Sequence, residues 1–366
     1  MKLLAAKKIF FNYATVGFLE PYSYRAILKF LAEYVKVGPP EVLEKYDNYS
    51  RKLSEEVSKL LNCDADEIVP VKNTTEGIII ASEALPLNRG DEVLLVGNEY
   101  PGNFLPWLKK RQDGILVTVI NDTNNNQAYK SLLAAINPRT KVIAMSWGQY
   151  YDGYLPDLTR LSKICKKHKI FLVIDGVHGV GTKVLDLKKT HVDMLSCGGQ
   201  KHLGAIVGIG FLYVNKKIIS RLKATKIGIR SVQGFDEHKY KLKNSAQRFG
   251  DGTQNLLGIV SLWAAVKHMN ALGMKNVEKK NALLLKKFKA CLRKNHIPFI
   301  DHKSQASVIA LKISDPKGLY EYLRQNHIYI KTVKDVARIS FCHKSNFEDF
   351  QKLVAKTKQW LATQNL

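Results

Sequence analysis

Short apolar runs alternate with amphipathic stretches through the first part of the chain. The apolar runs predict strands at residues 68–71, 92–96, 115–120, 142–147, 170–174, 192–195 and 210–214. Between them, apolar residues spaced three or four apart predict helices, among them 21–35, 42–61, 77–85, 129–136 and 158–167. Repeated strand–helix units predict an α/β fold with a mostly parallel sheet covered by helices.

The C-terminal part has a different pattern. Helices are predicted at residues 256–272, 277–294, 316–325 and 346–362, and strand-like segments lie between them. This mixture predicts a small α+β domain. We therefore expect a large domain at residues 15–255, and a small domain made of residues 256–366 together with the N-terminal segment 1–14.

The net charge of +25 is the unusual bulk property of the 366-residue chain. A basic excess favours nucleic acid or an anionic surface through long-range attraction. The lysines, however, are spread along the whole chain, singly or in pairs, and form no arginine-rich arm or aromatic–basic RNA-binding signature. We therefore do not expect nucleic-acid binding as the primary function. A basic nucleic-acid-binding protein on a retained fold is the non-enzyme alternative.

Composition and cysteine positions exclude several other classes of protein. The chain has no run of 18 apolar residues, and lysines interrupt the N-terminal apolar residues, so neither a membrane span nor a signal peptide is expected. The five cysteines are scattered and odd in number, which predicts neither a disulfide framework nor a zinc site, and we expect no bound metal. A cytoplasmic enzyme is the default expectation.

Several polar residues directly follow predicted strands: Thr75, Tyr100, Gln149, Asp175 and Lys201. Ligands of parallel sheets bind at the carboxyl ends of the strands, so we expect these side chains to lie together. A desolvated lysine can hold a carbonyl cofactor as a Schiff base, and an acid can pair with a protonated pyridine nitrogen. The alternative is that Asp175 caps a helix and Lys201 is a surface lysine.

The string Asn73-Thr74-Thr75-Glu76-Gly77 follows one strand and precedes a helix. Hydroxyls and free N–H groups at a helix N-terminus form an anion site. The alternative is a plain N-cap, in which Thr74 or Thr75 caps the helix and no ligand binds.

The chain contains a series of short motifs in a fixed order. They are Asn-Tyr-Ala at 12–14, NTTEG, NEYPGNFLPW, DGVHGVG, CGGQK followed by GIGFLYV, RFGDGTQN and RISFCH. This ordered set resembles the class V aminotransferase family of pyridoxal-phosphate enzymes, which have fold type I, and the resemblance covers almost the whole chain. Relatives in that family include cysteine desulfurases and isopenicillin-N-epimerase-like proteins.

The resemblance implies roles around the cofactor ring. Lys201 looks like the Schiff-base lysine and the base that moves the α-proton, and Asp175 like the partner of the pyridine nitrogen. Tyr100 stands where an aromatic side chain stacks on the ring. Gln149 and His178 are expected to approach the phenolic oxygen. For His178 the alternative is a helix-start histidine that bonds a backbone carbonyl.

At the phosphate end, the resemblance implies contacts from Thr74, Thr75 and Gln200. The desulfurase branch has a serine where this chain has Gly198, so phosphate binding is expected to depend more on Thr75, Gln200 and backbone amides. Thr253 resembles the residue that completes the phosphate site from the neighbouring subunit. This implies a homodimer with shared active sites.

On the substrate side, Arg338 looks like the arginine that holds the α-carboxylate, and Asn12 is expected to contribute to substrate binding. The predicted reaction is that of a class V aminotransferase acting on a small amino acid, and a 2-oxo acid is the second substrate that such a reaction implies. A C–S lyase or an epimerase of the same fold is the alternative. A cysteine desulfurase is disfavoured, because residues 301–337 contain no cysteine to carry sulfur.

Overall fold

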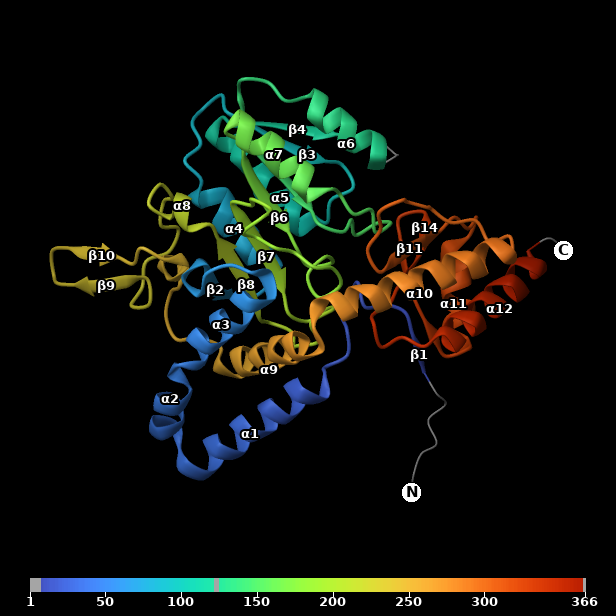
Figure 1. Ribbon diagram of the computed structural model, residues 1–366, viewed down its shortest axis with the longest axis horizontal. Coiled ribbons are helices and arrows are strands. Elements are labelled where there is room, and N and C mark those ends of the chain that lie inside the picture. Colours follow the sequence, from blue (N-terminus) through green and yellow to red (C-terminus); the bar gives the residue numbers. More distant parts are fainter. Residues whose placement is uncertain (1–7, 122–124, 365–366) are drawn as a thin grey trace.

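The computed structural model describes residues 8–121 and 125–364, and its largest feature is a seven-stranded sheet (Figure 1). In spatial order the strands are β2 (Ile68–Val71), β8 (Gly210–Val214), β7 (Met194–Gly198), β6 (Phe171–Asp175), β5 (Thr140–Ser146), β3 (Glu92–Val96) and β4 (Leu116–Ile120). Strands β7, β6, β5, β3 and β4 are parallel, and β8 is antiparallel to both of its neighbours. The expected α/β fold with a mostly parallel sheet is confirmed.

Both faces of this sheet are buried, which explains why its strands are continuous apolar runs. Alternate residues of one strand enter different cores: Leu94 and Val96 of β3 one core, Val93 and Leu95 the other. Helices α4 (Thr74–Ala84) and α5 (Pro101–Lys109) cover one face. Helices α3 (Tyr49–Leu61), α6 (Asn125–Ala134), α7 (Leu158–His168) and α9 (Leu256–Leu272) cover the other.

The chain enters the small domain at Gly273, where α9 and α10 (Met274–Lys294) meet at an angle of 80°. The expected boundary at residue 256 coincides with the start of α9, but this helix packs against α1 (Pro21–Val37) and α3 and so belongs with the large domain. No single helix in the described part of the chain has the length and composition to cross a membrane. Helices α9 and α10 pass such a test only as a bent pair.

The small domain is an antiparallel sheet backed by helices (Figure 1). Its strand order is β11 (Val308–Leu311), β14 (Val336–Ser340) and β13 (Lys331–Val333), and α10, α11 (Pro316–Gln325) and α12 (Phe347–Thr363) share its core. The N-terminal segment joins this domain, because β1 (Ile9–Phe10) pairs with β12 (Ile328–Tyr329) and Phe11 stacks on Phe350.

Some expected boundaries were wrong. The predicted helix 42–61 is two helices, α2 (Pro39–Asp47) and α3, and α5, which begins at Pro101, was not predicted. The short helix α8 (Lys216–Ile219) follows β8. After it, β9 (Val232–Phe235) and β10 (Tyr240–Leu242) form a hairpin that projects from the body (Figure 1). The N-terminal residues 1–7 and part of the Asn-rich loop lie outside the described residues.

Candidate active site

A cavity of about 610 Å³ lies between the carboxyl ends of the large sheet and the small domain. Seven of the predicted site residues line it: Thr74, Thr75, Tyr100, Asp175, Gln200, Lys201 and Arg338. The small domain contributes the segment 331–334, and the N-terminal segment contributes Ala14 and Thr15. Of the five residues expected together at the strand ends, four line this cavity, and Gln149 does not.

Lys201 and Asp175 lie at the floor of the cavity, at the ends of neighbouring strands. Asp175 is the last residue of β6, and its carboxylate accepts a hydrogen bond from the Val177 amide at 3.0 Å. Burial raises the pKa of Asp175, while the charge of Lys201 opposes the shift. Burial lowers the pKa of Lys201 to about 8, against the opposing effect of Asp175. Lys201 is thus not the surface lysine of the alternative interpretation, and it can become a neutral amine near physiological pH.

His178 contacts the same lysine. Its Nε2 atom lies 3.3 Å from Lys201 Nζ, and its side chain is almost fully buried. Burial, followed by the charge of Lys201, holds the pKa of His178 well below its usual range, so the ring is neutral. Its other ring nitrogen has no hydrogen-bond partner in the described part of the chain. The alternative bond to a backbone carbonyl is therefore not observed.

Tyr100 stands beside the lysine at the start of α5. The Lys201 ammonium lies 5.7 Å from the centre of the Tyr100 ring, and the Tyr150 ring meets it edge-on at 5.5 Å. A side-chain carbon at Gly102, in the same turn, would lie 2.3 Å from Thr75 Oγ1. A glycine here therefore lets the α5 backbone approach the Thr75 hydroxyl.

The start of α4 forms the opposite end of the cavity. Asn73 is the N-cap, because its side chain accepts a hydrogen bond from the Glu76 amide at 2.9 Å, so capping by Thr74 or Thr75 is excluded. Thr74 Oγ1 instead accepts a bond from the Gly198 amide at 2.9 Å. The first turn of α4 thus presents amides and the Thr75 hydroxyl to the cavity, a combination suited to a phosphate.

Gly198 has a clear steric consequence for Gln200. A side-chain carbon at position 198 would lie 2.5 Å from Gln200 Oε1 and 3.2 Å from Thr74 Oγ1. The Gln200 side chain therefore occupies the space that a serine at position 198 would need. A larger part for Gln200 in phosphate binding stays a prediction.

Gln149 is held from behind by a residue that the sequence analysis did not select. Gln149 Nε2 donates a hydrogen bond to Glu99 Oε1 at 2.8 Å, and Glu99 also accepts bonds from Asn103 and from the amide and hydroxyl of Ser146. Burial raises the pKa of Glu99 to about 7. The position of Glu99 directly after β3 could have identified it from the sequence. The sequence analysis selected the adjacent Tyr100 as the site residue after this strand. A contact of Gln149 with the phenolic oxygen stays a prediction.

Arg338 enters the cavity from the middle strand of the small sheet and is 3% exposed. Its guanidinium donates to the Tyr150 carbonyl and to Thr15 Oγ1, both at 2.9 Å. No carboxylate in the described part of the chain pairs with it, and burial lowers its pKa to about 10. Asn12 does not line the cavity and is linked to Arg338 only through Thr15. Its Oδ1 accepts a hydrogen bond from the Thr15 hydroxyl at 2.7 Å.

Thr253 does not reach this cavity. It lines a neighbouring hollow of about 170 Å³ together with Lys72, Glu76, Lys226 and Asp251. Within its own chain, Thr253 therefore cannot contact the same ligand as Lys201.

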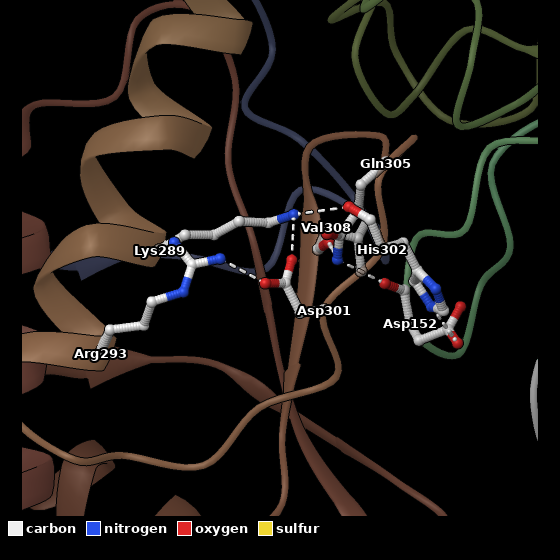
Figure 2. A network of polar contacts seen from close by, with 7 residues as sticks. All are labelled: Asp152, Lys289, Arg293, Asp301, His302, Gln305 and Val308. Atoms are coloured by element: carbon white, nitrogen blue, oxygen red, sulfur yellow. Dashed lines mark hydrogen bonds and ion pairs between the residues drawn. The ribbon is translucent and has the colours of Figure 1, made fainter.

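A buried polar network joins the loop after β5 to the small domain (Figure 2). Asp152 Oδ2 lies 2.8 Å from His302 Nε2, and Gln305 Nε2 donates to the Asp152 carbonyl at 2.9 Å. Lys289 donates to the His302 carbonyl at 2.9 Å and pairs with Asp301 at 2.7 Å. The loop that carries Gln149 and Tyr150 is thereby fixed to the domain that carries Arg338.

These groups fit pyridoxal phosphate. A lysine of lowered pKa, a buried acid beside it, an aromatic ring and a helix N-terminus are the groups that its aldehyde, pyridine nitrogen, ring and phosphate require. Among the described residues, no group of three or more His, Cys, Asp or Glu is placed to hold a metal ion.

Comparison with known proteins agrees with this fit. The family model for aminotransferase class-V matches residues 38–353. A probable cysteine desulfurase of Methanothermobacter thermautotrophicus is 26% identical over 295 residues, covering 79% of this chain and 70% of that protein. The apo cysteine desulfurase of Thermococcus onnurineus NA1 superposes with a TM-score of 0.88 at 19% identity, covering 97% and 95% of the two chains. The cystine C–S lyase C-DES, in complex with its product cysteine persulfide, gives a TM-score of 0.89 at 19% identity, covering 96% and 98%.

Proposed function

Because the chain belongs to the class V aminotransferase family, we propose that it cleaves a carbon–sulfur bond at the β-carbon of a small amino acid. Pyridoxal phosphate is the cofactor of this family, and the predicted cofactor is confirmed. The finer choice of reaction is supported by relatives named cysteine desulfurase and by a structural neighbour named cystine C–S lyase. It replaces transamination, which the resemblance alone favoured, as the leading hypothesis.

The positions of the cysteines carry this proposal. None of the five cysteines lines the cavity in the described part of the chain. Cys197 is fully buried beneath the site, where burial raises the pKa of its thiol, and Cys342 is buried in the small domain. A protein thiolate that takes up the sulfur is therefore missing from the site. In the proposed reaction the sulfur leaves with the product: the amino acid and one water give a 2-oxo acid, ammonia and a free thiol or sulfide.

The residues of this chain divide the work as follows. Arg338 holds the α-carboxylate with charge-assisted hydrogen bonds and thereby fixes the α-carbon. Lys201, neutral above a pH of about 8, removes the α-proton, and the neutral His178 ring at 3.3 Å accepts or donates a hydrogen bond at its Nζ. Asp175 holds positive charge at the pyridine nitrogen. When bound, pyridoxal phosphate supplies the electron sink that makes the α-proton acidic.

The active site is proposed to be shared between two copies of the chain. Thr253 lies outside the cavity of its own chain, whereas the resemblance gives it a contact with the phosphate. Both hold if Thr253 of one subunit contacts the phosphate bound in the cavity of the other subunit. Exposed apolar side chains on α1, including Tyr24, Leu28 and Leu31, offer a surface of the kind that a second subunit covers. A mass measurement in solution, with a monomer as the contradicting outcome, tests this part.

The reaction is tested with purified protein, pyridoxal phosphate and either L-cysteine or L-cystine. Pyruvate, ammonia and a sulfur product formed in equal amounts, and lost in Lys201→Ala, are expected. Pyruvate formation that requires no 2-oxo acid separates elimination from transamination. Conversion of the cofactor to its amine form, together with release of a 2-oxo acid that retains sulfur, would instead establish the aminotransferase. If the protein shows no absorbance from bound pyridoxal phosphate, both the lyase and the aminotransferase hypotheses are excluded.

A further inference from the structure

Two cations lie opposite each other on the small-domain wall of the cavity. Strands β13 and β14 are antiparallel, and their register pairs Lys331 with Arg338. Paired residues on antiparallel strands share one face of the sheet, with their Cβ atoms about 4.5–5.5 Å apart. Both residues line the cavity, Arg338 buried and Lys331 exposed.

No acid in the described part of the chain balances this pair. Among the described residues, Arg338 donates to two neutral oxygens, and no ion pair of Lys331 is observed. Asp335, the acid in the hairpin turn, accepts the Tyr151 hydroxyl at 2.7 Å. Asp175, the one acid among the described residues that line the cavity, belongs with Lys201. Like charges directly opposite on two strands destabilise a sheet. The arrangement therefore costs stability unless anions bind there.

The hairpin that carries Lys331 is fixed to the large domain. Lys334 donates to Asn98 Oδ1 at 2.9 Å, and Asp335 is held by Tyr151. Val333 and Val336 pack against Tyr151 on the same face of the sheet as Arg338. Strand β13 thus stays over the cavity, with Lys331 beside the guanidinium.

We propose that the substrate carries a second anionic group on its side chain, and that Lys331 binds this group while Arg338 holds the α-carboxylate. The inference rests on the proposed function for the identity of the amino-acid substrate, but it concerns recognition of the side chain. The chemical class is an amino acid whose side chain ends in a carboxylate, sulfinate or sulfonate. One cation would suffice for a neutral side chain. The paired strands present two, Lys331 and Arg338, and the further lysine of this wall, Lys334, is bonded to Asn98.

The test compares succinate with butyrate, which have the same number of carbons and differ by one carboxylate. Binding to the enzyme loaded with pyridoxal phosphate is measured by calorimetry in a buffer without other polyvalent anions. The native protein is expected to bind succinate about tenfold more tightly, the size of one charge-assisted hydrogen bond. In Lys331→Gln this preference disappears while butyrate binding is retained. Lys312→Gln, an exposed lysine after β11 outside the cavity, is the matched control and keeps the preference.

Equal binding of the two ligands by the native protein, or an unchanged preference in Lys331→Gln, would overturn the inference. Kinetics then separate it from the proposed reaction. Elimination from S-sulfocysteine with one water gives pyruvate, ammonia and thiosulfate. If S-sulfocysteine, L-cysteine and L-cystine are all left uncleaved but the succinate preference holds, the lyase proposal fails and the anion site stands. If neutral S-methylcysteine is cleaved as efficiently as S-sulfocysteine, the anion site fails and the lyase stands.

Discussion

Asp152 and His302 form a buried pair, with Oδ2 and Nε2 2.8 Å apart, across the contact between the two domains (Figure 2). Asp152 lies in the loop after β5, and His302 precedes β11 of the small domain. The same loop presents the Tyr150 carbonyl to Arg338. The pair therefore sets the position of the guanidinium relative to the floor of the cavity, although neither residue lines the cavity.

Replacement of His302 by Ala removes one hydrogen-bond partner of the buried Asp152 carboxyl, which keeps the Tyr154 amide. Removing one partner of a buried hydrogen bond costs about 1–3 kcal/mol, and we expect the free energy of unfolding to fall by about 2 kcal/mol in urea denaturation. The KM for the amino acid should rise as well. The loop that holds Asp152 also carries the Tyr150 carbonyl that positions Arg338, and this loop loses one of its bonds to the small domain. Arg293→Gln is the control: it breaks an ion pair with Asp301 at the exposed end of the same network and should cost less than about 1 kcal/mol. Equal losses in the two variants would contradict the role assigned to His302.

Replacement of Arg338 by Lys keeps the positive charge but removes the planar guanidinium, which can donate two parallel hydrogen bonds. The two hydrogen bonds to Tyr150 and Thr15 cannot both be kept, and the carboxylate loses bidentate binding. We expect KM to rise at least about tenfold and kcat to change less, because the proton transfer at Lys201 is not altered directly. Steady-state kinetics check this result. Arg324→Lys, at an exposed position on α11, should leave both constants unchanged, and an unchanged KM in Arg338→Lys would refute the clamp.

The sheet and the floor of the site could be predicted because both follow from local pattern. Each central strand is a continuous apolar run, and the residue after it necessarily lies at the carboxyl edge of a parallel sheet. Asp175 and Lys201 were found in this way. Helix α5 was missed because Pro106 stands inside it, although Pro101 at its first position is a common helix start.

The rest of the site depends on contacts between segments that are distant in sequence. Lys331 meets Arg338 only through the strand register, and Asp152 meets His302 only through the packing of the domains. Glu99 acquires its role from four donors, of which Ser146 and Gln149 lie on or after another strand. No local pattern predicts such pairs, because each residue alone is ordinary in its own segment.

Glu99 should make stability depend on pH in a defined direction. Its pKa is raised by burial from the usual 4.5 to about 7, so the folded state binds the proton more tightly than the unfolded chain. The stabilisation from this group is complete below about pH 4.5 and is lost as pH rises through about 7, with a total of roughly 3 kcal/mol. Urea denaturation at several pH values between 4.5 and 8 should therefore show a smaller fall in Glu99→Gln than in the native protein. The exposed Glu321→Gln should keep the native slope, and identical slopes in all three proteins would exclude a raised pKa at Glu99.

The lowered pKa of Lys201 should govern how fast the apoprotein takes up its cofactor. Only a neutral amine attacks an aldehyde, so the rate of uptake should rise with pH up to about 8 and level off above it. Asp175 opposes the effect of burial on Lys201, and in Asp175→Asn the midpoint should move to lower pH because that opposing charge is gone. Stopped-flow absorbance after mixing apoprotein with pyridoxal phosphate measures both curves. Ionisation of the free cofactor is common to both proteins and cannot produce a difference between them. A midpoint that stays in place in Asp175→Asn would show that Lys201 does not set the rate, or that Asp175 does not act on its charge.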